Sequence, residues 1–228
     1  MSETAEEIIR RQLGKSGGWK KGSLGATEAN EKVRTLEGRL NIDPLTGLES
    51  EYPLHDMLEG LQGRWQQDYR KGEFLKGTFV VADLDGLHNV NHKYGKIAGG
   101  NDYLKAAAQA IMKVARGNGR CFRSRESSDE FLLYLPGFKV RSEIETVLDV
   151  VDMLLEGEEK RLQDKYPGIK FGLSYTVASF HRAYPPKDAF DDANDAMGKA
   201  KTSETGERVG NVGRIFVNEL KLADQRYE

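Results

Sequence analysis

The chain of 228 residues has little cysteine, no excess of positive charge and no long apolar run. Its one cysteine, Cys121, excludes an internal disulfide and favours a reducing compartment, so we expect a cytoplasmic protein. Acids and bases nearly cancel to a formal net charge of −2, whereas a broad nucleic-acid or membrane surface needs a basic excess. No apolar run approaches the ~20 residues of a membrane span, and the acidic N-terminus does not predict a secretory signal. We therefore expect a soluble protein with neither nucleic acid nor membrane as its partner.

The composition divides the chain into three parts. Residues 1–28 contain few apolar side chains and many Gly and Lys, which predicts a flexible N-terminal extension. Apolar residues spaced four, three and four apart come next: Ala29, Val33, Leu36 and Leu40. This spacing predicts a connecting helix over residues 29–42. Residues 43–228 then have the length of one domain of ordinary size.

Within that domain, segments with helical and strand-like patterns alternate. Helical spacing of apolar residues predicts helices around 54–65, 104–115, 144–155 and 190–200. Runs of strand formers predict strands near 78–82, 120–125, 130–135, 171–180 and 214–217. The second and third of these strands flank a short polar segment, which predicts a β-hairpin. The order of elements predicts an α/β (α+β) fold, in which one central sheet with a hairpin carries the helices.

Acidic residues stand at two of the predicted turns. Asp83 and Asp85 follow the apolar strand 78–82, while Asp129 and Glu130 stand at the tip of the hairpin. Residues two apart on a strand share a face, and two carboxylates so close repel each other unless a cation lies between them. Carboxylate oxygens are the ligands that Mg²⁺ prefers. A solvated turn also carries such acids, but the two acidic turns together favour a site for Mg²⁺ or Mn²⁺ at Asp83, Asp129 and Glu130.

Five segments, in their order and spacing, resemble the GGDEF domain, the family of diguanylate cyclases. They are DPLTGL (43–48), VVADLDGLHNVNHKYG (80–95), SSDEF (127–131), GLSYTVASF (172–180) and DDANDAMGKAK (191–201). The resemblance implies a nucleotidyl cyclase fold with a palm-like central sheet. It also implies a homodimer in which two domains, each holding GTP and Mg²⁺, meet and make cyclic di-GMP.

The resemblance assigns roles to particular positions. It implies that Asp83 is a metal ligand, and that Asp129 and Glu130 bind metal and form the catalytic acid pair. It implies that Asn91 contacts the guanine base. Lys201 stands where the family contacts the phosphates.

Several positions of the nucleotide site depart from the family pattern. Ser127 and Ser128 replace two glycines, which allow a tight turn beside a phosphate; the serine hydroxyls offer hydrogen bonds to phosphate instead. His88 replaces a lysine and holds phosphate less strongly. The segment KIAGGNDYL is one residue longer than its family counterpart. The acid that reads guanine therefore falls on Asn101, or on Gly100 if the gap is placed elsewhere.

These features leave two interpretations of function. In the first, the chain binds a purine nucleoside triphosphate (NTP) with Mg²⁺ and condenses two GTP into cyclic di-GMP. In the second, it is a catalytically degenerate domain that signals by binding a nucleotide or a protein. The retained acids Asp83, Asp129 and Glu130 favour the first, and the altered phosphate and base contacts favour the second. Arg208 and Arg214 are both candidates for the phosphate-binding arginine.

Overall fold

The computed structural model describes residues 41–117, 119–124, 129–137, 140–202 and 211–217. Its elements, in chain order, are α3 (Glu51–Lys71), β1 (Gly77–Leu84), α4 (Leu87–Tyr94), the π-helix η1 (Gly95–Gly100), α5 (Asn101–Ala115), β2 (Arg120–Arg123), β3 (Glu130–Pro136), α6 (Arg141–Leu162), β4 (Leu173–Phe180), α7 (Pro186–Ala200) and β5 (Arg214–Phe216). The predicted extension 1–28 and residues 29–40 of the predicted connecting helix lie outside the described residues.

The strands form one sheet in the order β2-β3-β1-β4-β5. The central strand β1 is antiparallel to both β3 and β4, while β4 and β5 are parallel. Strands β2 and β3 form the predicted hairpin. All of β1 is buried because it has strands on both sides and helices on both faces, which explains its continuous apolar run. The predicted fold class, a central sheet with a hairpin and packed helices, is confirmed.

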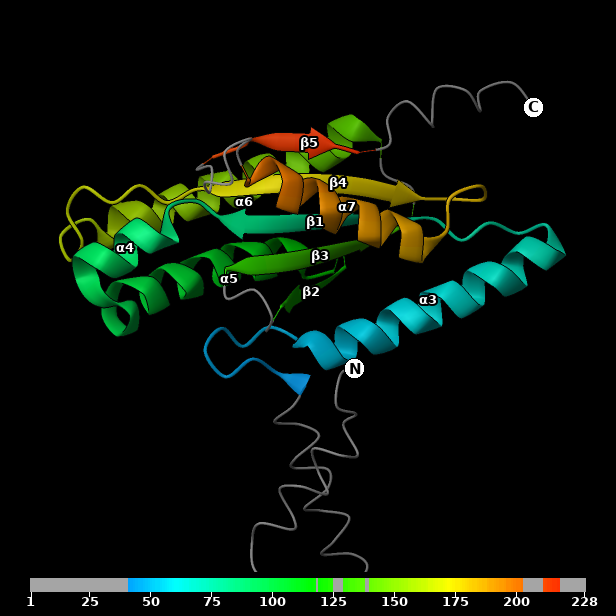
Figure 1. Ribbon diagram of the computed structural model, residues 1–228, viewed down its shortest axis with the longest axis horizontal. Coiled ribbons are helices and arrows are strands. Elements are labelled where there is room, and N and C mark those ends of the chain that lie inside the picture. Colours follow the sequence, from blue (N-terminus) through cyan, green and yellow to red (C-terminus); the bar gives the residue numbers. More distant parts are fainter. Residues whose placement is uncertain (1–40, 118, 125–128, 138–139, 203–210, 218–228) are drawn as a thin grey trace, which may run out of the picture.

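Two helical layers cover the two faces of the sheet (Figure 1). Val80 and Ala82 of β1 belong to the core shared with α5 and α6. Phe79 and Val81 point the other way, into the core shared with α3 and α7. By the same alternation Asp83 lies on the face of α3 and α7, at the end of β1 that points toward α4 (Figure 1). The fold thus brings a carboxylate to the edge of an apolar layer.

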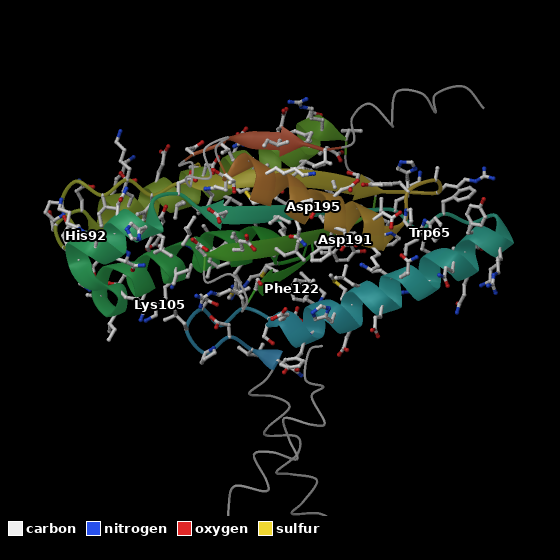
Figure 2. All side chains as sticks on the ribbon, in the orientation of Figure 1. Trp65, His92, Lys105, Phe122, Asp191 and Asp195 are labelled. Carbon is white, nitrogen blue, oxygen red and sulfur yellow. The ribbon has the colours of Figure 1, made fainter. Side chains whose placement is uncertain are left out.

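Helix α3 is held to the far end of this layer by an aromatic side chain. The Trp65 indole Nε1 donates a hydrogen bond of 2.9 Å to the carbonyl of His181, just beyond β4. Figure 2 shows Trp65 on α3 and, nearer the middle of the molecule, Phe122 of β2, which is fully buried against the same layer. Helix α3 therefore contacts the sheet beyond β4 at one end and the edge strand β2 at the other.

The DPLTGL turn is attached to the hairpin. Asp43 Oδ1 accepts hydrogen bonds from the Thr46 backbone N (2.9 Å), Thr46 Oγ1 (2.6 Å) and Arg123 Nη1 (2.9 Å). The backbone N of Arg123 also donates to the carbonyl of Glu49 at 2.8 Å. The segment that enters the domain is therefore bonded directly to β2, one strand away from the acids of β3.

Helix α4 continues into the π-helix η1, which local periodicity did not predict. A π-turn takes one residue more than an α-turn, so η1 takes up one residue of the long KIAGGNDYL segment before α5 begins. Gly99 and Gly100 permit the close packing that follows. A Cβ on Gly99 would lie 2.8 Å from Tyr94 Cβ, and one on Gly100 would collide with Asn91 Oδ1.

Candidate functional site

The hairpin places acidic residues beside the end of β1. Asp83 and Glu130 are direct partners in the antiparallel register of β1 and β3, so their side chains share a face. The backbone N of Leu84 donates to the carbonyl of Asp129 at 3.1 Å, which holds the hairpin tip against β1. Asp83 is only 1% exposed, although it ends an apolar strand. A carboxylate buried so deeply requires a positive partner.

That partner is the side chain of Lys201, which follows directly after α7. Its Nζ lies 2.7 Å from Asp83 Oδ1 and 2.7 Å from Asp85 Oδ1. The Lys201 side chain is 7% exposed, so the ammonium is nearly enclosed between the two carboxylates. Repulsion between Asp83 and Asp85 indicated from sequence that a cation lies between them. In the structure that cation is the ammonium of Lys201, a residue for which the resemblance implied a phosphate contact.

Asp85 is anchored by further donors besides Lys201. Its Oδ1 also accepts from Ser174 Oγ on β4 (2.7 Å), and its Oδ2 accepts from Asn211 Nδ2 (2.7 Å). Ser174 Oγ in turn accepts from the backbone N of Val212 at 2.9 Å. Lys201, Ser174 and Asn211 thus surround Asp85 with three donors. Ser174 and Asn211 could not be assigned from the sequence, because they lie 89 and 126 residues away from Asp85.

A buried tyrosine supports the backbone at Asp85. The Tyr103 hydroxyl lies 2.9 Å from the carbonyl of Asp85 and 2.8 Å from the carbonyl of Gly172, and it accepts from the Gly172 backbone N at 2.7 Å. Burial raises the pKa of Tyr103, and the nearby negative charge of Asp85 adds to this effect. The hydroxyl therefore stays protonated and fixes the turn after β1 against the start of β4.

The proposed base contacts lie on α4 and at the start of α5. Asn91 belongs to α4, and its Oδ1 is buried with no hydrogen-bond partner among the described residues. Of the two residues considered for the second base contact, Gly100 packs directly against Asn91 Oδ1, while Asn101 is the first residue of α5. The additional residue in the π-helix therefore puts a glycine, which has no side chain to offer, against Asn91.

The remaining phosphate candidates lie apart from the buried acids or outside the described residues. His88 is exposed on α4. Figure 2 shows His92, one turn further, at the periphery of the molecule and far from Asp195 on α7. Ser127 and Ser128 lie outside the described residues. The structure thus brings together Asp83, Glu130 and Lys201, but it does not bring His88 to them by any described contact.

Of the two arginine candidates, Arg214 has another partner. Its Nη1 lies 2.7 Å from Asp149 Oδ1 and its Nη2 lies 2.6 Å from Asp152 Oδ2, both on α6. Helix α6 covers the face of the sheet opposite Asp83. Arg214 therefore joins β5 to α6, whereas Arg208 lies outside the described residues.

A pocket of about 440 Å³ opens beside Glu130, between α3, α7 and the sheet. Its walls combine apolar and polar side chains, among them Leu54, Val81, Leu132, Phe190, Glu51, His55 and Asn194. Pockets that hold small organic ligands have volumes of roughly 300–1,000 Å³ and a similar mixture of side chains. Glu130, the register partner of Asp83, therefore adjoins a space of the size that a small organic ligand occupies.

The donors of this site match a divalent cation in chemical type. Asp83 and Glu130 offer carboxylate oxygens of the kind that Mg²⁺ and Mn²⁺ bind. In the described part of the chain, however, no three His, Cys, Asp or Glu side chains are placed to share one metal ion. The Lys201 ammonium also contacts Asp83. The carboxylate of Asp83 is thus a suitable ligand for a divalent cation, but it already pairs with the ammonium of Lys201.

Comparison with known protein families decides the identity of the domain. The family model described as "Diguanylate cyclase, GGDEF domain" matches residues 40–207. The chain belongs to the GGDEF family. No curated protein matches it. This GGDEF domain is homologous to diguanylate cyclases, a family that generally uses a divalent metal. Within the described residues, none of the helices is both long and apolar enough to cross a membrane.

Solved structures show the same fold. The coiled coil and GGDEF domain of DgcB from Caulobacter crescentus, in complex with c-di-GMP, is 14% identical with a TM-score of 0.61, over 94% of this chain and 100% of that one. The diguanylate cyclase SiaD from Pseudomonas aeruginosa, in complex with its activator SiaC, is 21% identical with a TM-score of 0.56, over 92% and 71%. The FimX GGDEF domain from Pseudomonas aeruginosa is 16% identical with a TM-score of 0.55, over 77% and 98%. At these identities the similarity establishes the fold.

Proposed function

We propose that this GGDEF domain binds a purine NTP as its complex with Mg²⁺ or Mn²⁺, at the point where β1 meets β3. The observation that carries the proposal is the buried carboxylate of Asp83, in register with Glu130, at the edge of the sheet in a member of this family. Asp83 and Glu130, with Asp129, hold the cation. When bound, the cation offsets the charge of the triphosphate and polarises the reacting phosphorus.

Other side chains of this domain act on the 3′ hydroxyl and on the phosphates. Asp129 and Glu130 accept the proton of the attacking 3′ hydroxyl, since both belong to the hairpin that adjoins β1. Lys201, held by Asp85, supplies a positive charge for the phosphates. Ser127 and Ser128 donate their hydroxyls to phosphate oxygens.

The base is read from α4 and α5. Asn91 and Asn101 offer carboxamides to the purine, and His88 lies on the exposed side of the same helix. A carboxamide presents one acceptor and one donor group, so it pairs with the two N–H donors of guanine less well than a carboxylate does. The domain therefore takes purine NTPs with a weak preference for GTP.

In the active form of this proposal, the reaction is the condensation of two GTP into cyclic di-GMP. Each 3′ hydroxyl attacks the α-phosphorus of the other GTP, and pyrophosphate leaves from each. Because one domain presents one set of acids, the reaction requires two domains face to face. We therefore expect a homodimer, and the single cysteine favours the cytoplasm as its location.

A second function is favoured by two observations. The ammonium of Lys201 is enclosed by Asp83 and Asp85, and Gly100 stands against Asn91 where a base-reading side chain would be expected. Both features weaken contacts with GTP while leaving the fold intact. In this case the domain binds a nucleotide or a partner protein, and signals without turning nucleotide over.

One experiment separates the two functions. The purified chain is incubated with each NTP and Mg²⁺ or Mn²⁺, binding is measured by calorimetry, and products are identified by mass. Cyclic di-GMP supports the cyclase, and NTP binding without product supports the degenerate domain. The absence of any metal-dependent NTP binding contradicts the proposed site.

A further inference from the structure

We propose that the ammonium of Lys201 and a divalent cation compete for Asp83, so that the lysine acts as an internal counter-ion of the nucleotide-free domain. The inference rests on the proposed function in one respect, because the cation is the one that accompanies the nucleotide. It assigns to Lys201 a role before any phosphate is bound. The lysine offsets part of the negative charge of the buried acids and sets the affinity of the site for metal.

The geometry at Asp83 explains why the ammonium and a divalent cation compete for its carboxylate. Lys201 Nζ is 2.7 Å from Asp83 Oδ1, and the exposed fractions of the two side chains are 7% and 2%. A Mg²⁺ or Mn²⁺ ion bound to the same carboxylate oxygen at about 2.1 Å would lie within about 5 Å of that ammonium. Two positive charges so close in a nearly dry site repel each other strongly, because little water screens them. Lys201 must therefore move away from Asp83 before a divalent cation binds there.

Asp85 allows the exchange without leaving a lone buried charge. It holds the same ammonium at 2.7 Å through Oδ1, and Ser174 and Asn211 fix its carboxylate in place. When a cation takes Asp83, the ammonium keeps its ion pair with Asp85. When the cation leaves, the ammonium is at hand to neutralise Asp83 again. Asp85 is thus a positioning residue for Lys201.

Titration with Mn²⁺ alone, in the absence of nucleotide, tests the competition. The full chain and its Lys201→Met variant are titrated while free Mn²⁺ is followed by electron paramagnetic resonance. Methionine keeps the length of the buried stem and removes the charge. Because a charge-assisted contact on Asp83 is lost, we expect the variant to bind Mn²⁺ at least about tenfold more tightly than the parent. Lys199→Met, at an exposed position two residues earlier, is the matched control and leaves the affinity unchanged.

A second variant separates competition for Asp83 from the general attraction of Mn²⁺ to a more negative site. Lys201→Met also makes the site more negative, whereas the double variant Lys201→Met/Asp85→Asn restores the parent's local charge. That charge is −1 in both proteins: one cation and two carboxylates in the parent, and Asp83 alone in the double variant. Competition predicts that the double variant still binds Mn²⁺ more tightly than the parent.

The outcomes are decisive for the proposal. Equal or weaker Mn²⁺ binding by the double variant overturns the competition, and so does an unchanged Lys201→Met. If Lys201→Met does not fold, the double variant decides alone, since it deprives one buried carboxylate of its ammonium where the single variant deprives two. A separate titration of the parent with NTP and Mg²⁺ tests the proposed function. Its failure, together with tighter Mn²⁺ binding by the variants, would refute the nucleotide site and leave this inference standing.

Discussion

Replacement of Asp43 by alanine tests how firmly the DPLTGL turn is joined to the β2–β3 hairpin. Asp43 Oδ1 accepts three hydrogen bonds, two from Thr46 and one from Arg123 of β2. The side chains of Arg123 and Asp43 are 11% and 12% exposed, so Asp43→Ala removes a carboxylate partner of a largely buried guanidinium. Breaking one side of a buried ion pair costs about 3–5 kcal/mol. We therefore expect the free energy of unfolding to fall by about that amount.

Urea unfolding followed by circular dichroism measures the loss. With a urea dependence of about 2 kcal/mol per molar, the midpoint should fall by about 2 M. Asp195→Ala is the matched control, since Asp195 is an exposed acid on α7 (Figure 2) and its loss should change the stability by less than about 0.5 kcal/mol. A loss below about 1 kcal/mol for Asp43→Ala would show that water replaces the carboxylate and that the turn is only loosely attached.

The same residue predicts a pH dependence of stability. Burial acts to raise the pKa of Asp43, but the hydrogen bonds from Thr46 and Arg123 outweigh it and hold the pKa below its usual value. A carboxyl with a lowered pKa in the folded state contributes stability above its unfolded pKa of about 3.9, and this is lost as the pH falls through the folded-state value. The stability difference between the parent and Asp43→Ala should therefore shrink between pH 6 and pH 3. A difference that grows toward acid pH would contradict this reasoning.

Three further predictions concern the proposed site and the core. Asp83→Asn should abolish Mg²⁺-dependent NTP binding in calorimetry, while Asp195→Asn should leave it intact; parent-like binding by the first variant would place the site elsewhere. GTP and ATP should differ in affinity by no more than about one to two decades, and Asn101→Asp should shift the preference toward GTP; a preference above roughly a thousandfold would show that other residues read the base. Burial, aided by the negative charge of Glu49, raises the pKa of the Cys121 thiol to about 11, so only about one thiol in a thousand is ionised at pH 8. Labelling of Cys121 with Ellman's reagent should therefore be slow until urea unfolds the domain, and rapid labelling of the native protein would contradict this.

The amino-acid sequence by itself determined the five strands and the four long helices of the described residues, and their order, but not the π-helix η1. The run TFVVA before Asp83 predicted a buried strand, and β1 is buried along its whole length. The helical spacing over 104–115 predicted α5, and two runs of strand formers around the SSDEF segment predicted the β2–β3 hairpin. These features are readable because burial of one face of a helix imposes a period of 3.6 residues on the apolar side chains, and burial of both faces of a strand requires a continuous apolar run.

The π-helix η1 could not be predicted from the local sequence pattern. The sequence showed one residue too many between Asn91 and α5, and it left the second base contact open between Gly100 and Asn101. The tertiary structure placed Gly100 against Asn91, since only a residue without a Cβ fits between the two turns. The Gly99-Gly100 pair was the available signal, but glycines alone do not reveal which side chain they face.

Only the tertiary structure decided which charges meet. The acids Asp83 and Asp85 indicated a cation, and the fold supplied it from Lys201, 116 residues away from Asp85 along the chain. Arg214, a phosphate candidate by position, pairs instead with Asp149 and Asp152 of α6. Apolar burial is periodic and therefore visible in the sequence, whereas an ion pair depends on two side chains from distant elements meeting within 4 Å, which no local pattern encodes.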